Sequence, residues 1–265
     1  MTRPLLSSAR EHLHRLLDRA YVPFSKQPRS VLVVLDDGQW IPGVRIESAS
    51  YSLSISALGN AVTTAYSLAC SGAVAGVVAS RPLAAGDRTY LHALAGFNGA
   101  ELSVTEEDTL ASYWRGAPPA SLGPAVDPTV PCPTSVADGV QAAHRVAQHA
   151  HIPESHFPVG AVLVHDGDTA LPGVNVEHPD WHRILCAERN ALSTAYAYGY
   201  TNITTLYLSC PKAPGGSPCG ACRQVLAERA PDATIYMDRH TDVPERSSPA
   251  DLLPAFFNSG DLVAE

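Results

Sequence analysis

Three cysteines and one glutamate stand at spacings that suit a metal centre. Glu188 follows Cys186 by two residues, and Cys219 and Cys222 form a C-x-x-C pair 33 residues beyond Cys186. Two thiols so spaced at a helix start can bind one ion, and a thiol from a neighbouring helix completes a set of three. Zn²⁺ prefers four tetrahedral ligands, so three protein ligands leave one position for water. The sequence therefore predicts one Zn²⁺ per chain, held by these three thiolates.

The carboxyl group of Glu188 is a candidate for proton transfer. It follows Cys186 too closely to be a comfortable ligand of the same ion, so we expect it to face the water in the open position. There it can take up a proton and hand it to a ring nitrogen or a leaving amine. The alternative is that Glu188 only favours the N-terminus of a helix electrostatically.

Three thiolates around a divalent cation leave excess negative charge, which weakens the acidification of bound water. Helix N-termini oppose this charge. Arg189 lies one helical turn from Cys186 and is predicted to compensate the thiolates by donating to them. Two alternatives remain open: a closed structural zinc site with His182 or Cys210 as fourth ligand, and a redox-active C-x-x-C pair.

An internal repeat organises the chain. Residues 21–66 align with residues 151–196 at a shift of 130 without a gap, and 15 of the 46 pairs are identical. Chance matching gives about three or four. A period this long indicates a duplicated domain rather than a solenoid. We expect a first domain over residues 1–115, a Pro-, Ala- and Gly-rich linker over 116–133, and a second domain over 134–265.

Each copy is predicted to run from a helix through a strand hairpin into a second helix. The helices are expected at 5–20, 56–71, 136–150 and 186–198, and the hairpin strands at 31–35, 40–46, 161–165 and 171–176. The second copy continues with strands at 203–209 and 234–237 and helices at 219–228 and 249–257. This alternation predicts an α/β fold in three layers, a mixed sheet flanked by helices.

Composition excludes several classes of protein. With 45% hydrophobic and 17% charged residues the chain is typical of globular proteins. A net charge of −8 without a basic stripe argues against a nucleic-acid partner. No apolar run reaches the roughly 18 residues of a membrane span. Six cysteines without a secretory signal predict a reducing, cytoplasmic location.

These motifs resemble those of the cytidine deaminase family. Cys-Ala-Glu at 186–188 and Pro-Cys-Gly-Ala-Cys at 218–222 match the signature of zinc deaminases. Three further segments are similar to family segments in the same order: Phe-Pro-Val-Gly-Ala at 157–161, Gly-Val-Asn-Val-Glu at 173–177 and Leu-Leu-Pro-Ala-Phe-Phe at 252–257. The resemblance covers about 125 residues of the second copy.

The resemblance implies a reaction and a substrate. Cytidine or 2′-deoxycytidine would be hydrolysed to uridine or 2′-deoxyuridine and ammonia, a step of pyrimidine salvage. Zinc-bound hydroxide would attack C4, and Glu188 would carry protons. Asn175 and Glu177 would hydrogen-bond the ribose, and Phe157 would pack against the base. Asn175 and Glu177 are two residues apart on a strand, so both point to one side.

The second copy departs from the family pattern after Glu177. Residues 178–181 read His-Pro-Asp-Trp where the family commonly has Asn-Ala-Ser-Tyr. A modified cytosine nucleoside or a nucleoside antibiotic is therefore an alternative substrate. A non-catalytic binding module stabilised by zinc is the alternative from another class.

The first copy lacks the chemistry. Ser56, Leu58 and Gly59 stand where the second copy has Cys186, Glu188 and Arg189, so the first copy should bind no zinc. The same shift pairs Thr89 and His92 with the C-x-x-C cysteines.

The first copy keeps Ala-Ser-Tyr at 49–51. Family members commonly build sites across subunit contacts, which implies a homodimer of four deaminase folds. In it Ala49, Tyr51 and Phe257 would contact substrate across domains or subunits. The alternative for Tyr51 is a place in the core.

Overall fold

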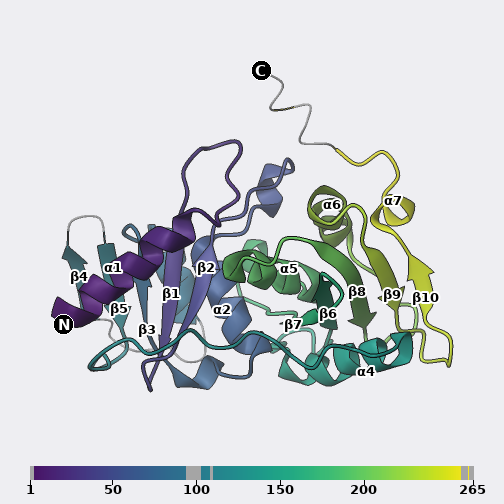
Figure 1. Cartoon of the computed structure of the whole chain (residues 1–265), viewed down its shortest axis with the longest axis horizontal. Helices are drawn as coiled ribbons and strands as arrows, with labels where there is room; N and C mark the ends of the chain where they lie inside the picture. The colour runs from purple at the N-terminus through teal and green to yellow at the C-terminus, as the bar shows by residue number, and fades with distance from the viewer. Residues whose placement is uncertain (1–2, 94–102, 108–109, 258–261, 263–265) are drawn as a thin grey trace.

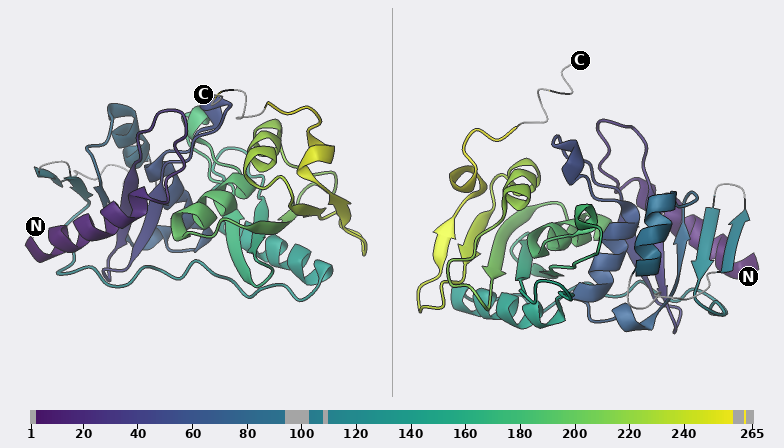
Figure 2. Two further views of the ribbon diagram at one scale, coloured as in Figure 1. Left: turned by 45° about the horizontal axis from the view of Figure 1, so that its top comes forward. Right: turned by 180° about the vertical axis from the view of Figure 1, so that it is seen from behind.

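The computed structural model describes residues 3–93, 103–107, 110–257 and 262. Two five-stranded sheets lie side by side with helices on their faces (Figures 1 and 2). The first half comprises α1 (Arg3–Leu17), β1 (Ser30–Leu35), β2 (Trp40–Val44), α2 (Ala57–Ser67), β3 (Val74–Ala79), α3 (Ala85–Ala93), β4 (Ser103–Glu107) and β5 (Leu110–Trp114). The second comprises α4 (Val136–Val146), β6 (Gly160–His165), β7 (Thr169–Val174), α5 (Ala187–Tyr198), β8 (Ile203–Ser209), α6 (Gly220–Arg229), β9 (Thr234–Met237), β10 (Glu245–Ser247) and α7 (Pro249–Leu252).

The sheets confirm the predicted α/β fold, with one difference between the halves. Their strand orders are β2-β1-β3-β5-β4 and β10-β9-β8-β6-β7. The second sheet is mixed, because β8 and β9 are parallel. In the first sheet β3 pairs with β5 in antiparallel fashion, as do the other described pairs. After α3 the chain enters the outermost strand β4 and returns through β5, which reverses the strand beside β3.

Four predicted helices end earlier than expected. Those at 5–20 and 136–150 end as α1 at Leu17 and α4 at Val146. The helix expected at 56–71 ends as α2 at Ser67, because Ala69 takes a left-handed conformation with φ +56°. The helix expected at 249–257 ends as α7 at Leu252, where Pro254 disfavours helical geometry in the residue before it. In the described part of the chain, every helix is too short or too polar to span a bilayer.

Segment 116–133, predicted as a linker, is held against both sheets. The indole Nε1 of Trp40 donates to the carbonyl oxygen of Gly123 at 3.0 Å, and Val126 N donates to Trp40 O at 2.8 Å. Farther on, Val130 N donates to Ala170 O at 2.9 Å. The segment therefore crosses from the first sheet to the second along one side of the molecule (Figure 1).

The two halves meet through residues related by the repeat. The buried hydroxyl groups of Thr64 on α2 and Thr194 on α5 are 2.8 Å apart. The Tyr66 ring lies 4.7 Å from that of His151, and the Tyr196 ring lies 6.4 Å from that of Tyr21. Thr64 and Thr194 are equivalent at a shift of 130, and the pair Tyr66–His151 is equivalent to the pair Tyr196–Tyr21. The halves therefore meet with approximate twofold symmetry between α2 and α5.

Glycines let α2 and α5 approach their sheets closely. A Cβ atom at Gly43 would lie 2.1 Å from Ala57 O, and one at Gly173 would lie 2.2 Å from Ala187 O. Both glycines belong to the repeated Pro-Gly-Val segment. This contact places the first turn of each helix against its hairpin. What the two copies share here is therefore a close backbone contact and not a reactive side chain.

We expect Gly173→Ala to lower the free energy of unfolding by about 2–3 kcal/mol, because the added methyl group meets a fixed backbone carbonyl. Urea denaturation measures this change. Gly215→Ala is the matched control, since nothing lies within 4 Å of a Cβ there. Its effect should stay within about 0.5 kcal/mol. Equal effects of the two substitutions would contradict the close approach of α5.

Candidate active site

Three sulfurs converge from the starts of two helices. Cys186 is the N-cap residue of α5, Cys219 is the N-cap residue of α6, and Cys222 lies in the first turn of α6. The Sγ atoms of Cys186 and Cys219 are 3.6 Å apart, as are those of Cys219 and Cys222, and all three lie within 4.8 Å of one another. Tetrahedral Zn–S bonds of about 2.3 Å place sulfurs about 3.8 Å apart. The three predicted ligands are therefore together at a spacing that fits zinc.

Neither alternative fourth ligand joins this cluster. Within the described residues, the group of metal-competent side chains contains the three cysteines alone. His182 is exposed to solvent, and the Cys210 sulfur faces Gly216, where a Cβ would lie 2.4 Å away. A set of three ligands is the arrangement of catalytic rather than structural zinc sites.

The three thiols influence one another's pKa. The hydrogen bonds that join Cys219 to Cys186 and Cys222 lower the pKa of Cys219. The pKa values of Cys186 and Cys222 are raised by their hydrogen bonds to the same cluster and by burial. Because thiolates repel one another, a bound cation would favour deprotonation of all three.

Glu188 lies beside these sulfurs in the first turn of α5 and is only 3% exposed. Burial is the main cause that raises its pKa to about 7, and the charge of Cys219 adds to it. A carboxyl group with this pKa can hold or release a proton near neutral pH. Glu188 does not belong to the group of three cysteines that could hold a metal, and its role in proton transfer stays a prediction.

Arg189 forms a hydrogen bond with the first half. Its Nη2 donates to Leu53 O at 3.0 Å, and its Nε is buried without a partner among the described residues. Compensation of the thiolates by Arg189 stays a prediction. The neighbouring Arg223 braces the metal loop instead, donating to Pro218 O at 2.7 Å and to Leu252 O at 3.2 Å.

The predicted substrate-binding residues gather at the end of β7. Asn175 Oδ1 accepts from Val159 N at 2.8 Å, and Asn175 Nδ2 donates to Phe157 O at 2.9 Å. Glu177 Oε2 accepts from the amides of Glu154 and Ser155 at 2.9 and 3.1 Å. Burial raises the pKa of Glu177, but these hydrogen bonds and the charge of His151 together hold it below its usual range. The carboxylate is therefore fixed in its charged form.

The first half keeps this frame without the metal ligands. Glu47 Oε2 accepts from the amides of Phe24 and Ser25 at 3.0 and 3.1 Å, as Glu177 does in the second half. At the place of Cys186, the Ser56 hydroxyl caps α2 by accepting from Gly59 N at 3.0 Å. The pairing of Thr89 and His92 with Cys219 and Cys222 is wrong, because α3 already begins at Ala85.

The three residues predicted to act across domains lie in different surroundings. Ala49 is buried, and its amide donates to Glu228 Oε2 on α6 at 3.0 Å. Tyr51 is 87% exposed, so its alternative place in the core is wrong. The Phe257 side chain is exposed, and its carbonyl oxygen accepts from Gln224 on α6. Contact of any of them with substrate stays a prediction.

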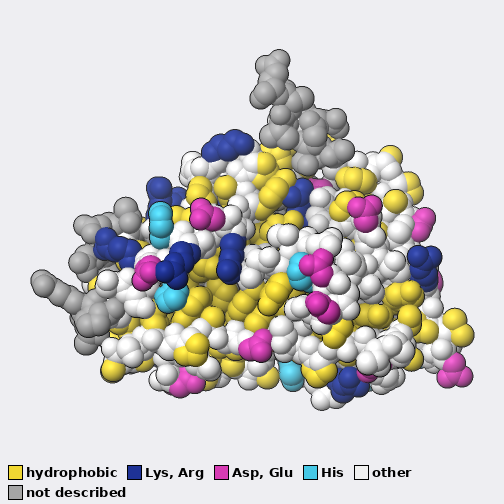
Figure 3. Space-filling view, in the orientation of Figure 1, with side chains coloured by type: hydrophobic (Ala, Val, Ile, Leu, Met, Phe, Trp, Pro, Cys, Tyr) yellow, Lys and Arg dark blue, Asp and Glu magenta, His cyan; other side chains and the backbone are white. Residues whose placement is uncertain are grey.

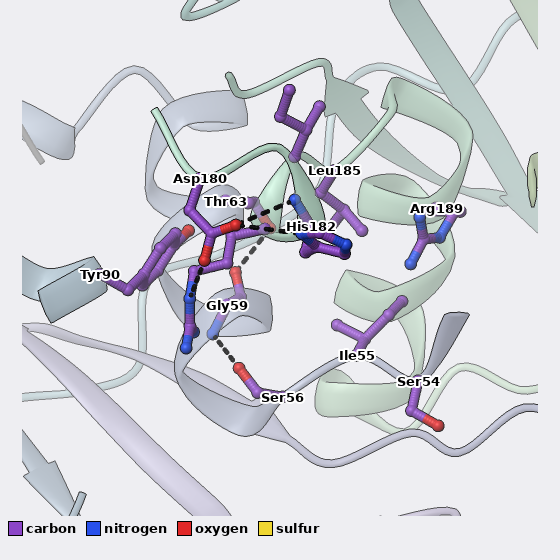
Figure 4. Close-up of a pocket in the computed structure, with 12 residues that line it drawn as sticks. Ser54, Ile55, Ser56, Gly59, Thr63, Tyr90, Asp180, His182, Leu185 and Arg189 are labelled. Atoms are coloured by element: carbon purple, nitrogen blue, oxygen red, sulfur yellow. Dashed lines mark hydrogen bonds and ion pairs between the residues drawn. The ribbon is translucent and has the colours of Figure 1, made fainter. Parts of the chain in front are cut away.

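A cavity of about 250 Å³ at the junction of the halves was not anticipated (Figure 4). Tyr90 and Thr63 line it from the first half, Asp180 and His182 from the second, and Arg189 reaches it from α5. The sequence carries no signal for this cavity, or for the bonds from Ser48 and Ala49 to Glu228, because docking of the halves brings these residues together.

We expect Cys222→Ser to lower bound zinc from about one per chain to a small fraction, because a hydroxyl is a poor ligand for this ion. Metal analysis of dialysed protein measures this. Cys210→Ser is the matched control, since Cys210 is also buried but lies outside the cluster. Equal loss of zinc in both variants, or none in either, would contradict the assignment.

Comparisons with known proteins agree with this geometry. A family model described as the cytidine and deoxycytidylate deaminase zinc-binding region matches residues 134–238. A cytidine deaminase of Halalkalibacterium halodurans is 32% identical over 124 residues, which are 46% of this chain and 94% of that protein. One of Sporosarcina psychrophila is 34% identical over 119 residues, which are 44% of this chain and 88% of the relative.

Among solved structures, the crystal structure of cytidine deaminase from Burkholderia pseudomallei shares 33% identity with this chain. The match covers 47% of this chain and all of that one, with a TM-score of 0.44. The sequence relatives are matched over nearly their full length by less than half of this chain. The chain belongs to the cytidine deaminase family.

Proposed function

We propose that the chain hydrolyses cytidine and 2′-deoxycytidine to the corresponding uridine and ammonia in pyrimidine salvage. The observation that carries this proposal is the buried carboxyl group of Glu188 beside three converging sulfurs. Cys186, Cys219 and Cys222 would hold one zinc ion in the second domain, residues 134–265. When bound, the zinc activates water for attack on C4.

Glu188 is the residue that moves protons in this proposal. With a pKa near 7 its carboxylate can accept a proton and its acid form can donate one within a single turnover. It would protonate N3 of the base and then the departing amine. A metal site that only stabilised a fold would gain nothing from a buried acid at this place, and this favours an enzyme over a zinc-stabilised binding module.

The frame at the end of β7 orients the nucleoside in this proposal. Glu177 is fixed in its charged form by two amides, so it can accept from ribose hydroxyls. Asn175 is held in one orientation by Val159 and Phe157, and the partly exposed Phe157 ring would cover the base. The fixed charge of Glu177 disfavours a phosphate on the sugar.

The loop that departs from the family pattern bears on the alternative substrates. His178 is buried with its ring 4.8 Å from that of Tyr90, whereas Trp181 is 76% exposed. Trp181 therefore does not fill the site within one chain. This favours unmodified nucleosides over a modified cytosine nucleoside or an antibiotic. Ammonia release from cytidine and from 5-substituted cytidines compares them directly.

We further propose a homodimer in the cytoplasm, with residues 1–115 as a non-catalytic deaminase-like domain. Tyr51 and Trp181 are equivalent at a shift of 130, and both expose large aromatic rings. Exposed aromatic side chains at related places suit a self-complementary contact between chains. Six free cysteines fit a reducing compartment.

We expect Glu188→Gln to lower kcat at least 10²–10⁴-fold, because proton transfer is lost. Zinc content and unfolding temperature should be retained, since the amide has nearly the same shape. An absorbance assay with cytidine and metal analysis measure both. Glu154→Gln is the control, because that exposed side chain lies outside the proposed machinery. Undiminished turnover in Glu188→Gln would contradict the proton-transfer role.

We expect Tyr51→Ala to raise KM for cytidine several-fold, because the ring would line a site of the neighbouring chain in the dimer. Light scattering should give a mass of about twice 28.0 kDa for the wild type. Thermal unfolding of the isolated chain should change little, because Tyr51 is exposed. Unaltered kinetics in this variant would exclude the contact with substrate.

A further inference from the structure

The first half contains a cavity of about 300 Å³ at the place that corresponds to the metal site of the second half. Ser56, Ala57 and Leu58 at the start of α2 line it, and these are the equivalents of residues 186–188. Ser80-Arg81-Pro82 after β3 also lines it, and these residues correspond to Ser209-Cys210-Pro211 at the end of β8. The first half therefore lacks the thiols but has a cavity at the corresponding place.

Three arginines line this cavity: Arg29, Arg45 and Arg81. The second half has no charge at the corresponding positions, which are occupied by Val159, Asn175 and Cys210. Each change from the second half to the first therefore adds one positive charge. The first half therefore differs from the second at this place by added positive charge as well as by the missing thiols.

The three guanidinium groups have few partners. Burial and the neighbouring charges of Arg81 and Arg45 lower the pKa of Arg29. The Nη1 atom of Arg29 is buried without a hydrogen-bond partner among the described residues. Arg45 forms an ion pair with Glu47 at 3.0 Å, but for Arg81 the described residues provide neither an ion pair nor a hydrogen bond.

The remaining acid of the cavity does not neutralise this charge. Asp87 lines the cavity, but its carboxylate pairs with Arg183 of the second half at 3.0 Å. Arg29 and Arg45 are partly buried and Arg81 is exposed. Their like charges repel one another, and an anion bound among them would reduce the repulsion. Guanidinium groups bind phosphate oxygens in bidentate fashion, which matches several arginines to one phosphate group.

Hydroxyl groups and a helix start add donors of the same kind. The Ser56 Oγ accepts from Gly59 N, and the Ser80 Oγ accepts from Ser30 N at 3.0 Å. Because both oxygens act as acceptors there, their O–H hydrogens remain for an anion. The eleven-residue helix α2 directs the positive end of its dipole at the cavity.

Charge is divided unequally between the halves. Residues 1–133 contain ten Lys and Arg against eleven Asp and Glu, whereas residues 134–265 contain eight against fifteen. In the view of Figure 3, most Lys and Arg side chains lie over the half that holds α1 and the first sheet. The first half is therefore nearly neutral, with a net charge of −1, whereas the second half has a net charge of −7 and opposes the approach of an anion more strongly.

We propose that this cavity is a binding site for a phosphate dianion, either free or as the phosphate of a nucleotide. Val31, Ala79 and Leu83 form an apolar wall beside the arginines, which would take the uncharged part of a nucleotide. The site lies apart from the three sulfurs and does not depend on the proposed deamination.

Isothermal titration of the zinc-loaded protein with inorganic phosphate, cytidine 5′-monophosphate and cytidine, at constant ionic strength, tests the proposal. Arg29→Gln and Arg81→Gln should each weaken phosphate binding about tenfold or more, because each removes a charged hydrogen-bond donor. Arg246→Gln is the matched control, since it removes the same charge from an exposed position in β10. It should leave the Kd unchanged.

Tighter binding of the monophosphate than of phosphate would support a nucleotide, and equal binding would support free phosphate. Turnover of cytidine without added phosphate should be the same in Arg81→Gln and the wild type. Absence of phosphate and monophosphate binding at millimolar concentration would overturn the proposal. Binding that all three variants weaken equally would overturn it as well.

Discussion

The close seating of α5 on the second sheet is the constraint on which the rest of the structure depends. Gly173 lets the first turn of α5 approach β7 until only a hydrogen atom fits between them. Cys186 is the N-cap residue of that turn and Glu188 lies in it, so the glycine sets the height of both side chains above the sheet. The same helix also forms the contact between the halves, through Thr194 and Asn190. Core packing, domain contact and candidate chemistry are therefore coupled in twelve residues of one helix.

The two halves show what a duplicated fold keeps when its chemistry changes. Glu47 and Glu177 each hold the preceding loop by two backbone amides, and Gly43 and Gly173 each seat a helix. These contacts involve backbone groups and do not depend on the reaction that a site performs. Ser56 and Leu58 stand in place of Cys186 and Glu188, and Arg29 and Arg45 stand in place of Val159 and Asn175. The shared frame therefore accommodates a different set of side chains around the start of its central helix.

The sequence predicted the features that depend on local pattern and on the repeat. Helix and strand positions follow from periodicity and turns, and the sulfurs could be grouped because each begins a helix whose place the repeat indicates. Two features depended on geometry that the sequence does not encode locally. The reversal of β5 comes from the route of the chain after α3, and Arg189 turns toward Leu53 because the first half offers a carbonyl group there. The bonds from Ser48 and Ala49 to Glu228 join residues about 180 positions apart, which no spacing rule connects.

The first half contributes to the geometry of the site although it contains no counterpart of its ligands. Arg189 and Asn190 of α5 bind the carbonyl oxygens of Leu53 and Thr63, so the first half holds the helix at the turn that carries Glu188. Glu228 holds α6, the helix of Cys219 and Cys222, against the Ser48–Ala49 segment. Both helices that supply sulfurs are therefore braced from the same neighbouring domain. Because the distance between their starts sets how close the three sulfurs lie, the first half contributes to the geometry of the sulfurs by positioning two helices rather than by supplying a sulfur.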